Sequence, residues 1–269
     1  MTEMPANEPL SGPFQPTTHD QWLDLVTQSL KGADFEKRLV AKTRDGIRIA
    51  PLHQQAADAA PIRAGRIASP WAIAQRIDHP APKIANELAL ADLEQGAAAL
   101  ILAFPEAAAA RGFGLDAGTV ADLDVALANV SLDMISLRVE PGPRQAERAE
   151  LVAALVAERG IAAADVSIVF GLDPLAAAMS AGGLPAAWAD VSRDFAATVT
   201  ELRAKGFGGA LVSCDTRPVH EAGGTEAQEL AAALAMGVAY LKALGDAGMP
   251  LAEATGLLSW TIAIDADQF

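Results

Sequence analysis

The sequence has a single cysteine, few aromatic residues and fewer basic than acidic side chains. Cys214 is the one cysteine among 269 residues, which excludes an internal disulfide framework and fits the reducing cytoplasm. Lysine and arginine number 20 against 34 aspartates and glutamates, and the formal net charge is −14. A surface this acidic repels nucleic-acid phosphates and anionic membranes. No apolar run approaches the roughly 20 residues of a membrane span, so we expect a cytoplasmic protein with neither a nucleic-acid nor a membrane partner.

The residues that are abundant are apolar. Hydrophobic residues make up 51% of the chain, which is enough for a sizeable core. A chain of 269 residues holds one large domain or two small ones. Residues 1–13 carry Glu3, Glu8 and three prolines without an apolar core, so they predict a disordered lead-in rather than a secretion signal.

Residues 14–66 are expected to form an N-terminal arm made of a helix, a hairpin and a linker. Thr18 and Gln21 have the spacing of a capping box, and the apolar residues that follow recur at helical intervals up to Gly32, the expected C-cap. Asp45-Gly46 stands between two short β-like runs, a pattern typical of a hairpin. The alanine- and proline-rich end of the arm is interpreted as a linker or a wrapping segment.

Residues 67–269 alternate between strand and helix patterns. The apolar strand candidates are 98–104, 133–139, 166–170, 209–212 and 257–264. The helix candidates between them are 82–95, 119–129, 144–159, 186–205 and 225–244. Alternation of this kind predicts parallel strands with crossover helices, and apolar strands are expected where both faces are covered. The predicted fold class is α/β, of the (β/α)8 TIM-barrel type.

About five strand–helix units are visible, whereas a closed barrel needs eight. The predicted barrel is therefore incomplete. An exposed parallel edge invites pairing with another chain. We expect that the chain is a fragment, that another chain completes the sheet, or that an open sheet covers its own edges.

The loop 213–224 joins the fourth predicted strand to the helix after it and carries Arg217, His220 and Glu221. Ligands and catalytic groups gather at the carboxyl ends of parallel strands. Any active site of this chain is therefore expected to include this loop. As an enzyme site, Arg217 would bind the carboxylate of a small anionic substrate and His220 would act as acid or base near neutral pH.

Two other kinds of chemistry are not favoured by the pattern. Cys214 directly follows a core strand and has no histidine–asparagine arrangement to activate it, so a buried inert thiol is expected rather than a nucleophile. His19, His53 and His79 are scattered without metal-ligand spacing, so we expect no metal site.

Several segments, taken together, form a specific pattern: 30–39, 45–47, 51–52, 70–76, 220–225, 229–230 and 265–269. They resemble the methylmalonyl-CoA mutase family, in particular its small, non-catalytic subunits, and the resemblance runs from Phe14 onward. The resemblance implies a (β/α)8 barrel that threads the CoA chain of its substrate along the axis, and a separate domain that binds adenosylcobalamin.

In this family the cofactor generates a radical that moves a carbonyl-CoA group between adjacent carbons, while the protein orients the reactants and excludes water. The resemblance implies a heterodimer, in which a catalytic mutase subunit is the partner of a small subunit, and an acyl-CoA as ligand. The cobalamin signature Asp-x-His-x-x-Gly occurs nowhere in the 269 residues. We therefore expect no cobalamin-binding domain in this chain.

At the loop 213–224 the resemblance implies that a catalytic site has been lost. Arg217 and Pro218 stand where catalytic subunits carry a tyrosine and a histidine, and a proline has no backbone N–H to donate. Glu221 stands at a position that touches the ribose of the cofactor in catalytic subunits. It is our cofactor-binding candidate, and Arg217 and His220 are the catalytic candidates.

The substrate positions are also replaced. Ala72, Ala74 and Arg76 match a threonine, an arginine and a tyrosine that contact substrate in catalytic subunits, so Arg76 is our substrate-binding candidate. Gly171 matches a substrate-binding glutamine, and Ala181 matches the arginine that grips the substrate carboxylate.

Three hypotheses follow. The chain is a non-catalytic small subunit that supports a catalytic mutase partner through its arm and barrel exterior. Alternatively it is an independent barrel enzyme that acts on a small anionic substrate through Arg217, His220 and Glu221. The third hypothesis is a degenerate, truncated paralogue without a ligand, which would aggregate or be readily cleaved.

Overall fold

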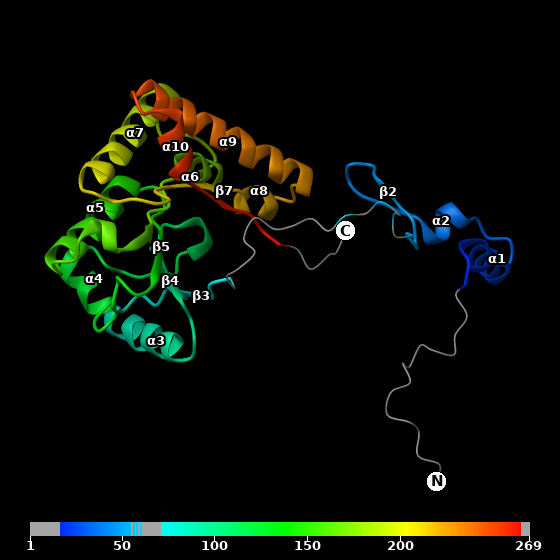
Figure 1. Cartoon of the computed structure of the whole chain (residues 1–269), viewed down its shortest axis with the longest axis horizontal. Helices are drawn as coiled ribbons and strands as arrows, with labels where there is room; N and C mark the ends of the chain where they lie inside the picture. The colour runs from blue at the N-terminus through cyan, green and yellow to red at the C-terminus, as the bar shows by residue number, and fades with distance from the viewer. Residues whose placement is uncertain (1–16, 55, 57, 59, 61–70, 265–269) are drawn as a thin grey trace, which may run out of the picture. The chain divides into compact units, whose positions relative to one another are not determined.

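The computed structural model describes residues 17–54, 56, 58, 60 and 71–264 (Figure 1). Contacts divide the chain into two compact units, Met1–Ala64 and Gly65–Phe269. The expected lead-in, residues 1–13, and the family-like segment 265–269 lie outside the described residues.

The first unit contains the expected helix and hairpin. Thr18 caps the first helix through the predicted capping box with Gln21, although Lys31 rather than Gly32 is the C-cap. The hairpin strands pair antiparallel. A short helix that begins after the N-cap Asp34 was not expected. The elements of this unit are α1 (His19–Leu30), α2 (Phe35–Leu39), β1 (Ala41–Lys42) and β2 (Arg48–Ile49).

The second unit contains parallel strands that pair in chain order. The strands are β3 (Ala74–Ile77), β4 (Ala99–Ala103), β5 (Ser136–Glu140), β6 (Ser167–Val169), β7 (Val212–Asp215) and β8 (Leu258–Thr261). The first four form one sheet and the last two another, and a parallel bridge between Leu172 and Val212 joins the two sheets. Neighbouring strands in chain order are the arrangement of a barrel rather than of a doubly wound sheet. The predicted α/β fold of incomplete barrel type is confirmed.

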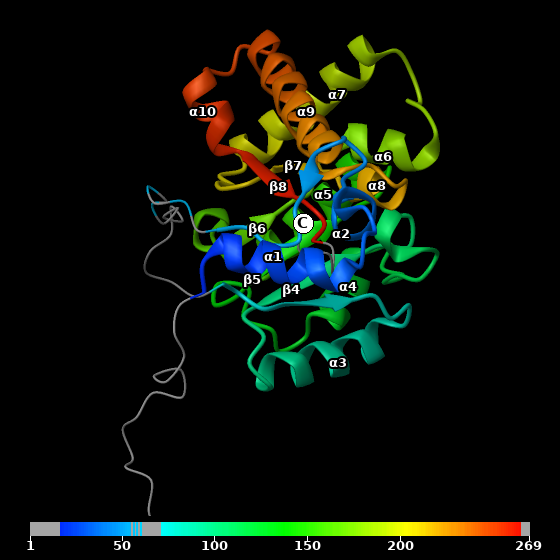
Figure 2. The same ribbon diagram turned by 90° about the vertical axis from the view of Figure 1, so that its right-hand side faces the viewer.

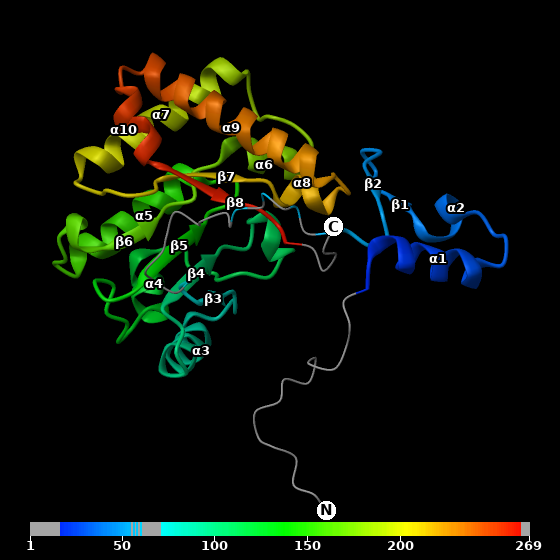
Figure 3. The ribbon, with the colours of Figure 1, turned by 45° about the vertical axis from the view of Figure 1, so that its right-hand side comes forward.

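The helices of this unit lie on the outer side of the curved row of strands, as the two further views show (Figures 2 and 3). They are α3 (Pro82–Glu94), α4 (Val120–Ala126), α5 (Gln145–Glu158), α6 (Pro174–Ala181), α7 (Trp188–Ala204), α8 (Arg217–Glu221), α9 (Glu226–Asp246) and α10 (Leu251–Gly256). Capping boxes start α4 at Thr119 and α9 at Thr225, where the sequence places helix starts. Among the described residues, none of these helices is long and apolar enough to cross a membrane.

The strands differ from the expectation in number and in pattern. The described part of the second unit has six strands rather than five, because β3 was missed, and β7 continues past Val212 to Asp215. Only β4 is apolar throughout. In β5, Leu137 and Val139 are buried among the helices, whereas Ser136 and Arg138 alternate with them on the other face and are only partly buried. The prediction of apolar strands was wrong for β5 because two of its residues on the inner face of the strand row, Ser136 and Arg138, are polar.

The core lies between the outer faces of the strands and the helices. Leu100, Leu137, Cys214 and Tyr240 are all at most 1% exposed. Burial of this apolar layer is the main force that fixes which face of each strand points outward. The alternate residues of the same strands are thereby directed to the inner face, where the candidate site lies.

Candidate functional site

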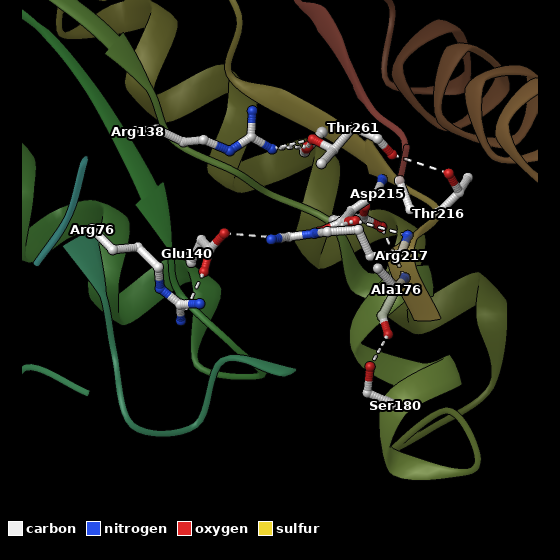
Figure 4. Close-up of polar contacts among 12 residues, drawn as sticks. Arg76, Arg138, Glu140, Ala176, Ser180, Asp215, Thr216, Arg217 and Thr261 are labelled. Atoms are coloured by element: carbon white, nitrogen blue, oxygen red, sulfur yellow. Dashed lines mark hydrogen bonds and ion pairs between the residues drawn. The ribbon is translucent and has the colours of Figure 1, made fainter. Parts of the chain in front are cut away.

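One small pocket lies at the carboxyl ends of β5, β6 and β7, where an α/β barrel places its ligands. Its polar lining is Arg138, Glu140, Gln145, Asp173, Ser213, Asp215 and Arg217. Glu140 and Asp215 are the last residues of their strands, and Arg217 opens α8. The close-up shows side chains from several strands directed toward one another across this face (Figure 4).

Glu140 joins two of the residues that the sequence singled out. Its Oε1 accepts a hydrogen bond of 2.8 Å from Nη2 of Arg217, and its Oε2 lies 3.6 Å from Nη2 of Arg76. The Glu140 side chain is only 7% exposed. Arg76 and Arg217, predicted separately as substrate and catalytic candidates, are therefore brought to one carboxylate (Figure 4). Glu140 itself was missed, and its only signal was a carboxylate directly after a predicted strand.

Arg217 is held by a second carboxylate as well. Its Nε lies 2.9 Å from Oδ1 and 3.0 Å from Oδ2 of Asp215, and its backbone N–H donates to Oδ1 at 3.1 Å. Burial acts to lower the pKa of Arg217, but the hydrogen bonds to Asp215 and the charge of Glu140 outweigh it and raise the pKa above its ordinary value. The guanidinium is thus fixed in the charged state, with its Nε and Nη2 donors already used by protein carboxylates.

Asp173 ties the end of β6 to its surroundings. It caps α6 by accepting from the backbone N–H of Ala176 at 2.9 Å, and it accepts from the N–H of Asp215 at 2.7 Å and from the hydroxyl of Tyr240. Burial raises the pKa of Asp173 to about 7, although these hydrogen bonds act the other way. Asp173 is therefore a structural junction of β6, β7 and α9 that titrates near neutral pH.

His220 does not join this cluster. It lies on α8, and its Nδ1 is 3.7 Å from Oε2 of Glu229 in the first turn of α9. Oε1 of Glu229 accepts hydrogen bonds from the Thr216 hydroxyl at 2.8 Å and from the N–H of Ala263 at 2.9 Å. The histidine therefore faces a structural carboxylate between α8 and α9, not the pocket at Arg217.

Glu221 is also separate from the cluster. Its side chain is about half exposed, and its Oε1 lies 3.6 Å from Nη2 of Arg111. It lines a neighbouring depression together with Glu106 and Pro218. The three residues of the expected enzyme site, Arg217, His220 and Glu221, therefore point to three different sets of partners.

The comparison with known families decides what kind of barrel this is. The model of the family described as methylmalonyl-CoA mutase matches residues 61–269. The chain belongs to the methylmalonyl-CoA mutase family. This confirms the family indicated by the sequence motifs.

Known relatives carry the name "methylmalonyl-CoA mutase small subunit". The one from Streptomyces virginiae is 32% identical over 97% of this chain and 43% of its own length. Those from Propionibacterium freudenreichii subsp. shermanii and Porphyromonas gingivalis are 28% and 27% identical, over 98% and 97% of this chain and 43% of their own lengths. The chain thus spans less than half the length of these methylmalonyl-CoA mutase relatives.

Gly171 has a geometry that bears on the mutase comparison. Its φ is +66°, in the left-handed region that favours glycine. A Cβ at this position would lie 2.1 Å from the carbonyl oxygen of Val139 and 3.3 Å from Cδ of Pro141. The backbone at the position matched to a substrate-binding glutamine therefore has no room for a side chain.

Cys214 and the histidines show no sign of further chemistry in this mutase-family chain. Cys214 is buried, and burial raises the pKa of its thiol to about 12, so it stays protonated and unreactive at neutral pH. This supports the interpretation of an inert thiol. Within residues 17–54 and 71–264, no group of three histidine, cysteine, aspartate or glutamate side chains is arranged to hold a metal ion.

Proposed function

We propose that this chain is a small-subunit component of a methylmalonyl-CoA mutase. In this proposal it supports a catalytic partner in a cytoplasmic heterodimer that interconverts methylmalonyl-CoA and succinyl-CoA with adenosylcobalamin, and it does not carry out the rearrangement itself. The family membership and the names of the relatives support the complex. The non-catalytic role rests on the site residues.

The observation that carries the proposal is the state of Arg217. By the resemblance, Arg217 and Pro218 stand where catalytic subunits have a tyrosine and a histidine. Arg217 is bound to Asp215 and Glu140, and Pro218 has no side-chain or backbone donor. A proline has no donor, and an arginine held by two protein carboxylates cannot replace a tyrosine that helps to drive homolysis or a histidine that donates to a migrating thioester carbonyl.

The inner face offers further support. Arg138 extends from β5 to hydroxyl groups on β7 and β8, where it donates to Ser213 at 2.9 Å and to Thr261. It crosses the face along which the family is expected to thread the CoA chain (Figure 4). Gly171 gives further support, because the resemblance matches it to a substrate-binding glutamine. A residue with a side chain could be accommodated at this position only if the backbone moved.

The residues of this chain do not fit adenosylcobalamin. The sequence signature that supplies the cobalt ligand is absent from the 269 residues. His220 is turned toward Glu229, and Glu221, the cofactor-binding candidate, is paired with Arg111. We therefore assign the cofactor to the catalytic partner.

The first test is activity. The purified chain is assayed for methylmalonyl-CoA mutase turnover with adenosylcobalamin, alone and after mixing with the catalytic mutase subunit of the same organism. We expect no turnover by the chain alone and co-purification with the catalytic subunit. Turnover without the partner would sink the non-catalytic role, and failure to bind the catalytic subunit would sink the heterodimer.

A second test addresses the arm. Helix α1 has no buried residue, and Leu25 is 59% exposed, so its side chain is accessible to a partner. We expect Leu25→Asp to weaken co-purification at least tenfold while Gln28→Glu, an exposed polar position of the same helix, leaves it unchanged. Equal binding by the two variants would show that α1 does not contact the partner.

A further inference from the structure

We propose that Arg138, Ser213 and Thr261 form an oxoanion-binding site on the inner face of the strands, suited to a carboxylate or phosphate group of a small molecule. This site does not depend on the proposed mutase role, because it is argued from the contacts of these three side chains and not from a match to catalytic subunits. No metal or cofactor is required.

The three residues converge from β5, β7 and β8. Nη2 of Arg138 donates to Oγ of Ser213 at 2.9 Å and to Oγ1 of Thr261, across 75 and 123 residues of chain. The parallel register pairs Ser213 with Ser259 and Asp215 with Thr261, which places Ser213 and Thr261 on the same face of the two strands. Arg138, Thr261 and the ribbon between them are visible in the close-up (Figure 4).

Arg138 differs from the other two arginines of this face, Arg76 and Arg217, in forming no ion pair with a carboxylate of the described residues. Arg76 lies within 3.6 Å of Asp78 and Glu140, and Arg217 is paired with Glu140 and Asp215. Within residues 71–264 no carboxylate approaches Arg138 within ion-pair distance. No carboxylate in this range is hydrogen-bonded to Arg138, and its charge is balanced only at a longer distance, by Asp215, Glu140 and Asp173.

The electrostatic balance points the same way. Burial lowers the pKa of Arg138 below its ordinary value, and the charge of Arg217 adds to this effect. The charges of Asp215, Glu140 and Asp173 offset it only in part. The shift shows that the charged form is not fully compensated by its surroundings. An anion that contacts this guanidinium would restore the compensation.

The site also offers unused donors. A guanidinium has five N–H groups, and the bonds to the two hydroxyls use only those of Nη2. Both hydroxyl oxygens accept from Arg138, so the hydroxyl hydrogens of Ser213 and Thr261 point away from the guanidinium. The two oxygens are 3.5 Å apart, and only one of the two hydrogens can lie between them. The other hydroxyl hydrogen is free to donate to a ligand. Hydroxyls polarised by a cation are stronger donors. Positive charge and donors without a local acceptor are the chemistry that binds an oxoanion.

The planar guanidinium sets the preference for the ligand. Arginine binds planar or tetrahedral oxoanions through parallel N–H groups, which a spherical ion such as chloride cannot match. Ser213 and Arg138 both line the pocket at the strand ends, so the ligand can enter from that side. A single carboxylate or phosphate group at the tip of a small molecule fits this arrangement.

The test is thermal denaturation of the 269-residue chain with added sodium succinate, sodium phosphate or sodium chloride at matched ionic strength. A ligand that binds the native state raises Tm in a saturable manner. We expect succinate or phosphate to do so beyond chloride, and the stronger of the two identifies a carboxylate or a phosphate as the natural group. A response to both salts that does not exceed that of chloride overturns the proposal.

Variants separate specific binding from a general salt effect. Arg138→Gln is expected to weaken the apparent affinity for the oxoanion at least tenfold, whereas Arg193→Gln, at an exposed arginine of α7, leaves it unchanged. Thr261→Val keeps the guanidinium and removes one hydroxyl, so it should weaken the affinity severalfold. If Arg138→Gln does not fold, Thr261→Val decides the matter. A variant response equal to that of the wild type, in Arg138→Gln or in Thr261→Val, overturns the site.

Discussion

Glu140 accepts a hydrogen bond from Arg217 at 2.8 Å, although 77 residues of chain separate the two. The carboxylate that makes this bond is almost fully buried and also faces Arg76. It is the link between the first strand of the second unit and the helical turn after β7. This relationship makes Glu140 a polar position of the inner face at which stability should be sensitive to substitution.

We expect Glu140→Ala to lower the free energy of unfolding by about 1–3 kcal/mol, because it leaves two arginines without their shared counter-charge. The estimate is below that for a fully buried pair, since Arg76 and Arg217 are 32% and 28% exposed and solvent screens part of the charge. Urea unfolding measures the change. Glu147→Ala, which removes an exposed partner of Arg144, is the control and should change stability by less than about 0.5 kcal/mol. Equal losses in the two variants would contradict the assigned role of Glu140.

Gly237 in α9 is a second sensitive position. A Cβ there would lie 2.5 Å from Cη2 of Trp260 on β8, so Gly237→Ala forces the indole or the helix to shift. We expect a loss of about 1–3 kcal/mol, typical of overpacking, together with a change in tryptophan fluorescence.

Gly245 in the same helix is a matched control for Gly237. No atom lies within 4 Å of a Cβ built at Gly245. Gly245→Ala should therefore be neutral or stabilising by about 0.5–1 kcal/mol, because alanine is the better helix former. A stabilising Gly237→Ala would show that Trp260 does not pack against the helix at this point.

Gly171 tests the backbone at the end of β6. Gly171→Ala combines a left-handed φ with a contact of 2.1 Å to the carbonyl of Val139, so we expect a loss of about 3 kcal/mol or more. Gly183→Ala, where a Cβ meets no atom within 4 Å, should change stability by less than about 1 kcal/mol. Thermal unfolding of the two variants distinguishes them, and similar Tm values would rule out the close approach.

The raised pKa of Asp173 predicts how the free energy of unfolding depends on pH. Its folded-state pKa is raised to about 7, above the value of about 3.9 for an unfolded aspartate, mainly by burial. The folded state therefore holds a proton that the unfolded state has released between these values. The contribution of Asp173 to stability is fully present below about pH 4, falls as pH rises, and levels off above about pH 7.

Asp173→Asn should remove this contribution to the pH dependence, because an asparagine does not titrate. Asp173→Asn also removes the oxygen that accepts from the N–H of Asp215. At low pH the variant should therefore be less stable than the wild type. Tyr240→Phe removes a hydrogen bond that lowers the pKa of Asp173. The fall in stability should therefore still begin near pH 4 but become larger and extend to higher pH. Unfolding measured from pH 4 to 8 checks both variants, and an unchanged slope in Asp173→Asn would refute the assignment.

Local signals in the sequence predicted most of the helices. Thr18, Thr119 and Thr225 each form a capping box with a residue three positions later, and each starts a helix at the predicted place. These features depend only on neighbouring residues, which is why the sequence alone reveals them. Cys214 was also interpreted correctly as buried, since it belongs to a strand with an apolar outer face.

The elements that were missed are short, namely β3, α2, α6, α8 and α10, and two of them have polar or unusual sequences. Strand β3 is Ala-Gln-Arg-Ile and mostly exposed, so it lacks the apolar pattern of a covered strand. Helix α8 was predicted to be a loop, but Pro218 occupies its first turn, where proline is tolerated. Short elements such as these are determined by tertiary contacts more than by local propensity.

The candidate site could be predicted only in part. The sequence identified Arg76 and Arg217 individually, through a resemblance and through a position after a strand. It could not show that both meet Glu140, because that contact depends on strand register and on side chains that cross between strands. The sequence also could not show that His220 and Arg217, which are three residues apart, have different partners, because these contacts too depend on the tertiary structure.

The chain order of the strands has a consequence for the kinetics of folding. The strand pairings from β3 to β6, and from β7 to β8, join residues between 25 positions (Ala74 to Ala99) and 46 positions (Val212 to Leu258) apart. The contact between Arg138 and Thr261 spans 123 residues. Loop-closure entropy rises with length, so the pairings can form in succession while the inner polar contacts form last. Substitutions at Arg138 or Glu140 should then accelerate unfolding and leave the refolding rate nearly unchanged.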